Sequence, residues 1–164
     1  MKQIVVGGVA AAALVASGHA SVMAATANFD ATAEILEAIS ITAAQNLGFA
    51  SILPSATTAD TVVIDTAGAR TCGAALTCTG TASAASFDVA GTDGATYAIT
   101  LPAAADITSG ANTMQVNGFT SSIGATGTLT GGAETFTVGG TLNVGINQAP
   151  GNYTGTFVMT VDYN

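Results

Sequence analysis

Hydrophobic and polar residues alternate with a period of two over the last fourteen residues of the chain, from Gly151 to Asn164. This alternation predicts a half-buried strand with one face turned toward a core. The apolar side chains stand at odd positions, and they are Tyr153, Phe157, Met159, Val161 and Tyr163. Since no later segment of the sequence is left to pair with the outer edge of this strand, we expect another segment to cover it.

A second run with the same period begins near residue 25. Its odd positions carry Ala25, Ala27, Phe29, Ala31, Ala33, Ile35, Ile39 and Ile41, with mostly polar residues between them. A helix over residues 33–38 is the alternative, because Glu34, Leu36 and Glu37 favour helices. The run is longer than an ordinary strand. We therefore expect two parts, an extension strand around residues 25–35 and a first domain strand around residues 39–44.

Short apolar runs bounded by turn residues fill the middle of the chain and indicate an all-β fold. We expect antiparallel hairpins between residues 47–52 and 61–65, between 86–90 and 95–101, and between 135–138 and 141–144. Asp93-Gly94 and Gly139-Gly140 supply turn residues for the last two hairpins. The strand over residues 114–119 should carry a bulge or a turn at Asn117-Gly118. This spacing of short strands is typical of a sandwich.

The first two dozen residues have the pattern of a secretory signal peptide. Lys2 precedes an apolar run that is too short to span a bilayer comfortably. Val22-Met23-Ala24 predicts cleavage before Ala25, and cleavage after Ala20 is the second choice. The sequence thus predicts a signal peptide over residues 1–24, an N-terminal extension over 25–38 and one domain over 39–164, in an exported protein that keeps no membrane segment after cleavage.

Cleavage would leave an acidic chain. Arg70 would remain as the only cation against ten carboxylates, a net charge of −9. Such a chain has no basic patch to neutralise phosphates, so we expect no nucleic-acid partner and no binding to anionic lipid. Lysine, which often protects exposed sheet edges, would also be missing. We therefore expect protein to cover the edges in the working state.

Cys72 and Cys78 lie in a short loop rich in glycine and alanine. An exported protein meets an oxidising compartment, so we predict a disulfide between them. A metal site or a redox site is disfavoured, because no histidine follows residue 24. Without histidine or lysine, a serine or threonine nucleophile would also lack a base. We expect no catalytic residues, no metal and no cofactor, and hence no enzyme.

The spacing between Gly151 and the penultimate Tyr163, with alternating apolar residues between them, resembles the C-terminal signature of chaperone-usher pilus subunits. In that family the fold is an immunoglobulin-like antiparallel β-sandwich that lacks its last strand. A periplasmic chaperone first fills the gap, and the N-terminal strand of the next subunit then replaces the chaperone. The middle of the chain resembles an uncharacterised bacterial secreted domain family of unknown function.

The resemblance implies a pilin-like all-β protein that polymerises by donor-strand exchange into a surface fibre with a role in adhesion or biofilm. It implies copies of itself or sister subunits, a periplasmic chaperone and an outer-membrane usher as partners. The donor strand would present Ala27, Phe29, Ala31, Ala33 and Ile35, and it would lie beside the strand from Gly151 to Tyr163. The alternative hypothesis is a self-complete secreted sandwich, a carbohydrate-binding or surface-layer module.

Overall fold

Twelve β-strands make up the regular secondary structure of residues 25–164, the part of the chain that this computed structural model describes, and no helix occurs there. The predicted all-β class is confirmed, whereas the predicted signal peptide lies outside the described residues. The strands are β1 (Ser40–Gln45), β2 (Ser51–Leu53), β3 (Asp60–Ile64), β4 (Arg70–Cys72), β5 (Thr77–Thr79), β6 (Ala85–Ala90), β7 (Thr96–Thr100), β8 (Ala104–Ser109), β9 (Asn112–Ser121), β10 (Thr126–Thr128), β11 (Ala133–Val144) and β12 (Thr160–Tyr163).

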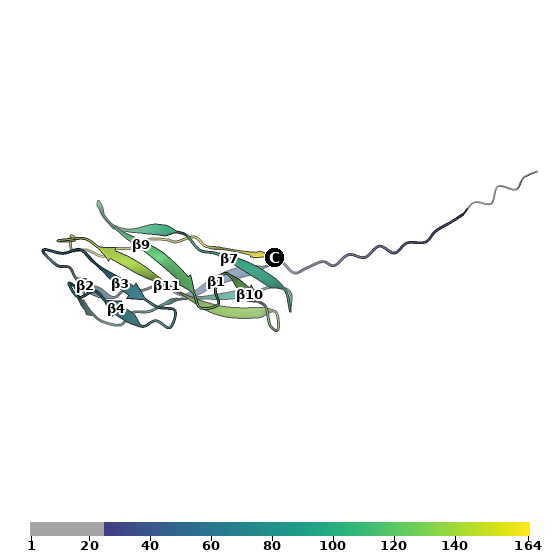
Figure 1. The fold of residues 1–164 in the computed structure, drawn as a ribbon, viewed down its shortest axis with the longest axis horizontal. Helices are drawn as coiled ribbons and strands as arrows, with labels where there is room; N and C mark the ends of the chain where they lie inside the picture. Colours follow the sequence, from purple (N-terminus) through teal and green to yellow (C-terminus); the bar gives the residue numbers. More distant parts are fainter. Residues whose placement is uncertain (1–24) are drawn as a thin grey trace, which may run out of the picture. The chain divides into compact units, whose positions relative to one another are not determined.

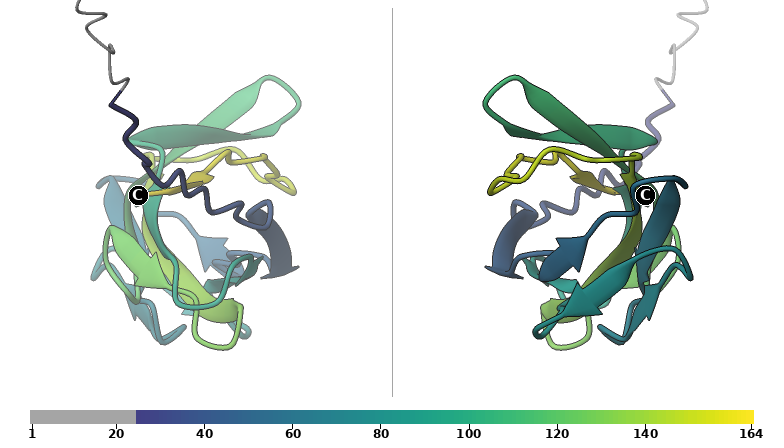
Figure 2. Two further views of the ribbon diagram at one scale, coloured as in Figure 1. Left: turned by 90° about the vertical axis from the view of Figure 1, so that its right-hand side faces the viewer. Right: turned by 90° about the vertical axis from the view of Figure 1, so that its left-hand side faces the viewer.

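The strands form a sandwich of antiparallel sheets within residues 35–164, a compact unit of the chain (Figure 1). The larger sheet has the order β1-β6-β11-β3-β4, and the β8–β9 pair joins it through β9 and β11. A smaller sheet has the order β10-β7-β12, and β2 pairs with β5. In the end-on views, β1 and the C-terminal segment lie on the same side of this unit (Figure 2).

The long strand β11 is the centre of the larger sheet. It pairs with β6 along residues 133–138 and with β3 along residues 140–144, while β9 pairs with it along residues 138–143. The predicted turn at Gly139-Gly140 is wrong, because the strand continues through both glycines. A Cβ atom at Gly139 would lie 2.3 Å from the carbonyl oxygen of Ile64. These glycines therefore allow two strands to approach β11 closely.

Two other predicted hairpins are wrong as well. The segment 47–52 contributes β2, which pairs with β5, whereas the segment 61–65 contributes β3, which pairs with β4 and β11. Strands β6 and β7 belong to different sheets, so the turn at Asp93-Gly94 crosses the sandwich. The predicted irregularity at Asn117-Gly118 is confirmed, since the β9–β11 register shifts there and Gly118 has a φ of 59°.

The core consists of two clusters of buried residues. The first includes Tyr97, Phe136 and Val161, and the second includes Val62, Val116 and Leu142. Leu47 and Phe119 pack against both clusters, so they mark the place where the two meet. Burying a large apolar side chain contributes about 1.5–3 kcal/mol, so these clusters supply most of the driving force for folding.

The disulfide between Cys72 and Cys78 is present, as predicted. Asp60 stabilises the loop that the disulfide closes. Its carboxylate accepts hydrogen bonds from the N–H groups of Ala75 at 2.9 Å and Thr61 at 2.8 Å. These two hydrogen bonds, the one from Ala75 first, hold the pKa of Asp60 below its usual range. The loop thus gives the second core cluster a covalently closed cover.

Candidate functional site

Two strands at the rim of the sandwich have an outer edge without a partner strand among residues 25–164. Strand β1 ends the order of the larger sheet, and β12 ends the order of the smaller one. Each pairs on one side alone, β1 with β6 and β12 with β7. An unpaired edge presents backbone N–H and C=O groups that another strand can bind.

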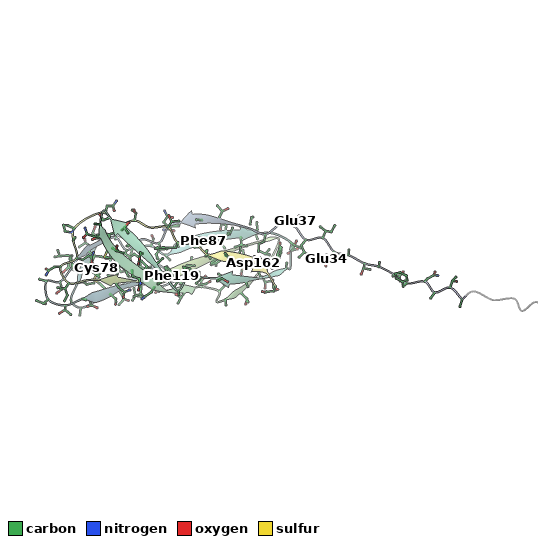
Figure 3. All side chains as sticks on the ribbon, turned by 90° about the horizontal axis from the view of Figure 1, so that it is seen from above. Glu34, Glu37, Cys78, Phe87, Phe119 and Asp162 are labelled. Carbon is green, nitrogen blue, oxygen red and sulfur yellow. A yellow bond between two sulfur atoms is a disulfide. The ribbon has the colours of Figure 1, made fainter. Side chains whose placement is uncertain are left out.

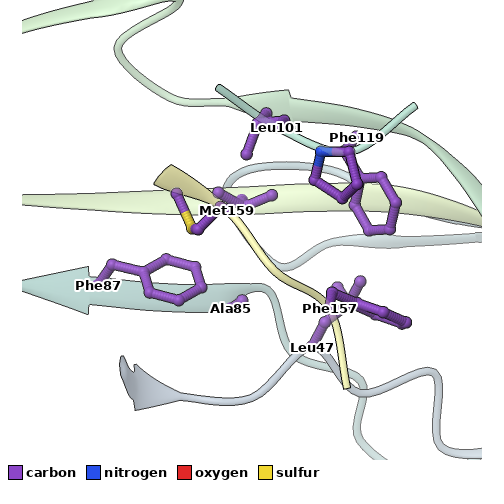
Figure 4. A pocket seen from close by; sticks show the side chains of 9 residues that line it. Leu47, Ala85, Phe87, Leu101, Phe119, Phe157 and Met159 are labelled. Atoms are coloured by element: carbon purple, nitrogen blue, oxygen red, sulfur yellow. The ribbon is translucent and has the colours of Figure 1, made fainter. Parts of the chain in front are cut away.

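An apolar pocket with a volume of about 40 Å³ opens beside these edges (Figure 4). Its walls come from β6, β9, β11 and the segments that follow β1 and β7 or precede β12, and no charged residue lines it. The side chains labelled in Figure 4 are those of Leu47, Ala85, Phe87, Leu101, Phe119, Phe157 and Met159. Pro102 and Val138 complete the lining. The pocket lies where the two core clusters meet, because Leu47 and Phe119 belong to its wall.

The predicted C-terminal strand is regular over Thr160–Tyr163 alone. Residues 151–159 form no continuous ladder, although Thr154 makes an isolated bridge to Thr108 of β8. Gly151 and Gly155 let this segment approach β8, since a Cβ atom at Gly155 would lie 2.5 Å from the carbonyl oxygen of Asp106. The C-terminal segment therefore runs beside β8 and then pairs with β7. The edge of this segment that faces away from β8 and β7 has no partner strand among the described residues.

The two-residue alternation of this segment is present in its side chains. Val161 is buried, and Tyr153, Phe157, Met159 and Tyr163 are partly buried. In contrast, Val158 is 74% exposed. The ring of Phe157 packs edge-on against that of Phe119, with 5.2 Å between the ring centres. Of these odd positions, Phe157 and Met159 line the pocket.

The predicted donor residues form no strand in the single chain. Residues 25–38 carry no regular secondary structure, and their side chains are exposed. Phe29 is 90% exposed and Ile35 is 94% exposed, and Ala27, Ala31 and Ala33 are exposed too. A strand needs a partner for its backbone groups. The extension therefore presents an unpaired apolar face.

Several pocket residues escaped the sequence analysis. Leu47, Phe87, Leu101 and Phe119 lie on four separate segments, and the assumed hairpins placed them in the wrong neighbourhoods. A signal was nevertheless present, because Phe87 and Phe119 are two of only six phenylalanines in the chain. Only the pairing of the strands shows that these rings face one pocket.

Tyr163 links the end of β12 to the start of the domain. Its hydroxyl donates to the carbonyl oxygen of Glu37 at 2.8 Å and accepts the N–H of Thr92 at 2.8 Å. The N–H of Glu37 in turn donates to the Thr92 hydroxyl at 2.7 Å. A Cβ atom at Gly91 would lie 2.1 Å from the Tyr163 hydroxyl oxygen, so glycine is required beside it. The exit point of the extension is thereby fixed.

A buried tyrosine and a carboxylate form a second polar cluster. The Tyr97 hydroxyl donates to Glu134 Oε2 at 2.8 Å, and the same oxygen accepts the N–H of Thr128 at 2.9 Å. Burial, followed by the hydrogen bond to Glu134, raises the pKa of Tyr97 well above its usual value. A Cβ atom at Gly127 would lie 2.4 Å from both side chains, so the pair is closed over and serves the packing of the core.

Within residues 25–164, no cluster of three or more histidine, cysteine, aspartate or glutamate side chains is arranged to hold a metal ion. Among the same described residues, no helix has the length and hydropathy needed to cross a membrane. The disulfide is typical of proteins that work in an oxidising, extracytoplasmic compartment.

Comparison with known protein families identifies the family of the domain. Neither a curated protein nor a solved structure matches the chain. The model of the family described as "Domain of unknown function (DUF4402)" matches residues 39–163, which span the sandwich from just before β1 to the end of β12. The chain therefore belongs to the DUF4402 family.

Proposed function

We propose that this protein is a structural subunit of a bacterial surface fibre, and that it polymerises when residues 25–35 of one copy insert beside the C-terminal segment of another. One observation carries the proposal. An apolar pocket opens between two unpaired edge strands, in a chain that also presents an unpaired segment with one apolar face. The apolar face of this segment would suit a strand inserted between those edges.

The two surfaces match in polarity. The pocket has no charged residue, and the odd face of residues 25–35 consists of four alanines, Phe29 and Ile35. Burial of Phe29 and Ile35 against the next copy would contribute at most about 3–6 kcal/mol together, at about 1.5–3 kcal/mol for each large apolar side chain. The even face, which carries Asn28, Asp30 and Thr32, would stay in water. Insertion therefore hides the apolar face without burying a charge.

The inserted strand would run antiparallel to β12. Every strand pair of the sandwich is antiparallel, and this arrangement is slightly more stable for each residue. Residues 25–35 and residues 151–161 are equal in number, so one strand of about 36 Å, at about 3.3 Å for each residue, would cover the free edge from residue 151 to residue 161. The inserted strand would enter at the Tyr163 end of β12 and leave at the opposite end of the domain.

Assembly requires partners that protect the open edges before polymerisation, because such edges promote aggregation. By the resemblance to chaperone-usher subunits, a periplasmic chaperone would occupy the pocket first and an outer-membrane usher would organise the exchange. The finished fibre would stand at the cell surface and serve adhesion or biofilm formation. We propose no enzymatic role, since a serine or threonine nucleophile would find no histidine or lysine after residue 24 to act as its base.

The test is a denaturing gel of protein recovered from the surface of expressing cells. Unheated samples should show a ladder of multimers, and heated samples should show a single band, because exchanged strands are held by non-covalent contacts. A monomer in both samples would contradict the proposal. It would favour the self-complete sandwich, in which the chain's own extension closes the sheet.

A further inference from the structure

The junction between the extension and the domain is very short. Two hydrogen bonds fix Glu37, one from its N–H to the Thr92 hydroxyl and one from the Tyr163 hydroxyl to its carbonyl oxygen. The proposed donor strand ends at Ile35, so Leu36 is the one residue between the two. Two residue steps span at most about 7 Å. A domain whose strand fills a neighbour's pocket must therefore lie against that neighbour.

The direction of the inserted strand decides which ends of the two domains meet. A strand antiparallel to β12 ends where the C-terminal segment begins, at the end of the sandwich that holds β2 and the tip of β11 (Figure 1). Glu37 and Cys78 mark the two opposite ends of the domain in Figure 3. The Glu37 end of one copy would thus face the β2 end of the next.

The β2 end carries apolar side chains that are exposed instead of packed in the core. Leu53 is 66% exposed and Ile146 is 51% exposed. Their loops are joined, since the N–H of Asn147 donates to the carbonyl oxygen of Ser55 at 2.9 Å. We name this the end surface, and it comprises residues 53–56 and 145–148.

Charge distinguishes the end surface from the rest of this acidic chain. Residues 53–59 and 145–151 contain no charged side chain, and Asp60, which pairs with Val144 beside them, has its carboxylate bonded to the N–H groups of Thr61 and Ala75. The opposite end carries Glu37, Asp93 and Asp162, whose side chains are exposed. Two copies that met through carboxylates on both sides would repel each other. The end surface is an uncharged place on which the acidic end can dock.

We propose that the end surface, centred on Leu53 and Ile146, binds the Glu37 end of the next copy of this chain, with Leu36 packed against it. The inference rests on the proposed function. The contact is head-to-tail, so each copy can bind the next and lengthen the chain of copies as a filament. It adds a rigid joint between domains to the exchanged strand.

The test uses fibres assembled from a variant that carries Leu36→Cys and Ile146→Cys. After mild oxidation, boiling in detergent without reductant should leave a covalent ladder, and reductant should collapse it to one band. The control variant carries Leu36→Cys and Val63→Cys, because Val63 is 37% exposed but lies on β3 away from the end surface.

The outcomes separate the two proposals. A covalent ladder in the Ile146 variant and not in the Val63 variant supports the end contact. A heat-sensitive ladder that gives no covalent ladder in the Ile146 variant, or equal covalent ladders in both variants, overturns the end contact and leaves strand exchange standing. Wild-type protein without any heat-sensitive ladder overturns both.

Discussion

The hydroxyl of Tyr163 donates a hydrogen bond of 2.8 Å to the carbonyl oxygen of Glu37, across 126 positions of sequence. One bond thus joins the end of the last strand to the segment that leads into β1. The extension consequently leaves the sandwich at a fixed point, beside the end of the free edge of β12. A donor strand that starts from a fixed point carries a defined register into the next copy.

The first prediction concerns Tyr163→Phe. The change removes the bonds to Glu37 and Thr92, so we expect a loss of about 1–2 kcal/mol of unfolding free energy in urea denaturation. Hydrogen exchange at the Glu37 amide should become faster as the exit point loosens. The matched control is Tyr153→Phe, which removes a hydroxyl bonded to the carbonyl oxygen of Ala149. Equal exchange at Glu37 in both variants would contradict this role of Tyr163.

The second prediction concerns Gly139→Ala. The new methyl group would lie 2.3 Å from the carbonyl oxygen of Ile64, a backbone atom that cannot move alone. We expect a loss of about 1–3 kcal/mol, the usual effect of overpacking. The control is Gln115→Ala at an exposed position of β9, which should stay within about 0.5 kcal/mol of wild type. Two variants of equal stability would show that Gly139 is not a close-approach position.

Gly139 also shows which part of the fold can be predicted from the sequence and which part cannot. The period of two identified the all-β class and the faces of the strands, because side-chain alternation is a local property. The pairing of the strands is not local. Two adjacent glycines are typical of a tight turn, and nothing in the neighbouring residues reveals that β3 and β9 both crowd this point. The larger sheet was therefore predicted as separate hairpins instead of strands paired along β11.

The third prediction concerns alkaline pH. Burial and the hydrogen bond to Glu134 raise the pKa of Tyr97, so the folded state keeps its proton while the unfolded chain loses it near the usual value of 10.0. The contribution of protonated Tyr97 to the free energy of unfolding is therefore complete below about pH 10 and is lost as the pH rises above 10. Urea midpoints measured from pH 8 to 11 should fall more steeply for wild type than for Tyr97→Phe. Parallel curves would contradict the assignment.

The fourth prediction concerns the disulfide. Replacing Cys72 and Cys78 by serine should lower the unfolding free energy by about 2 kcal/mol, as the chain-entropy model gives for a loop of this size. Urea denaturation measures the loss, and reduction of the wild-type protein should reproduce it. A double variant as stable as the oxidised protein would show that the hydrogen bonds of Asp60 organise the loop without the bond between the sulfur atoms.

One wall of the candidate site could be predicted from the sequence, because side-chain alternation is a local property. The odd positions of the C-terminal segment, from Phe157 to Tyr163, followed from alternation, and the structure turns them inward. The opposite wall of the pocket did not follow. Leu47 and Phe119 belong to segments far apart in sequence, and they meet because two core clusters join there. A sequence pattern identifies a face, whereas the fold decides what that face lies against.

The final prediction compares two neighbouring positions of the extension. In an extended strand, residue 31 points to one side and residue 32 to the other. Ala31→Asp would force a carboxylate into the apolar pocket of the next copy, which costs several kcal/mol or requires a proton, whereas Thr32→Asp stays in water. A shift of register by one residue offers no escape, because it would bury Asn28 and Asp30.

The most direct test of strand exchange is the multimer ladder of these two variants on unheated denaturing gels, with circular dichroism as the check that each domain is folded. We predict that Ala31→Asp abolishes the ladder, that Thr32→Asp retains it, and that both domains stay folded. Equal ladders from the two variants, or unfolding of the domain by Ala31→Asp alone, would contradict the insertion of this strand into another copy.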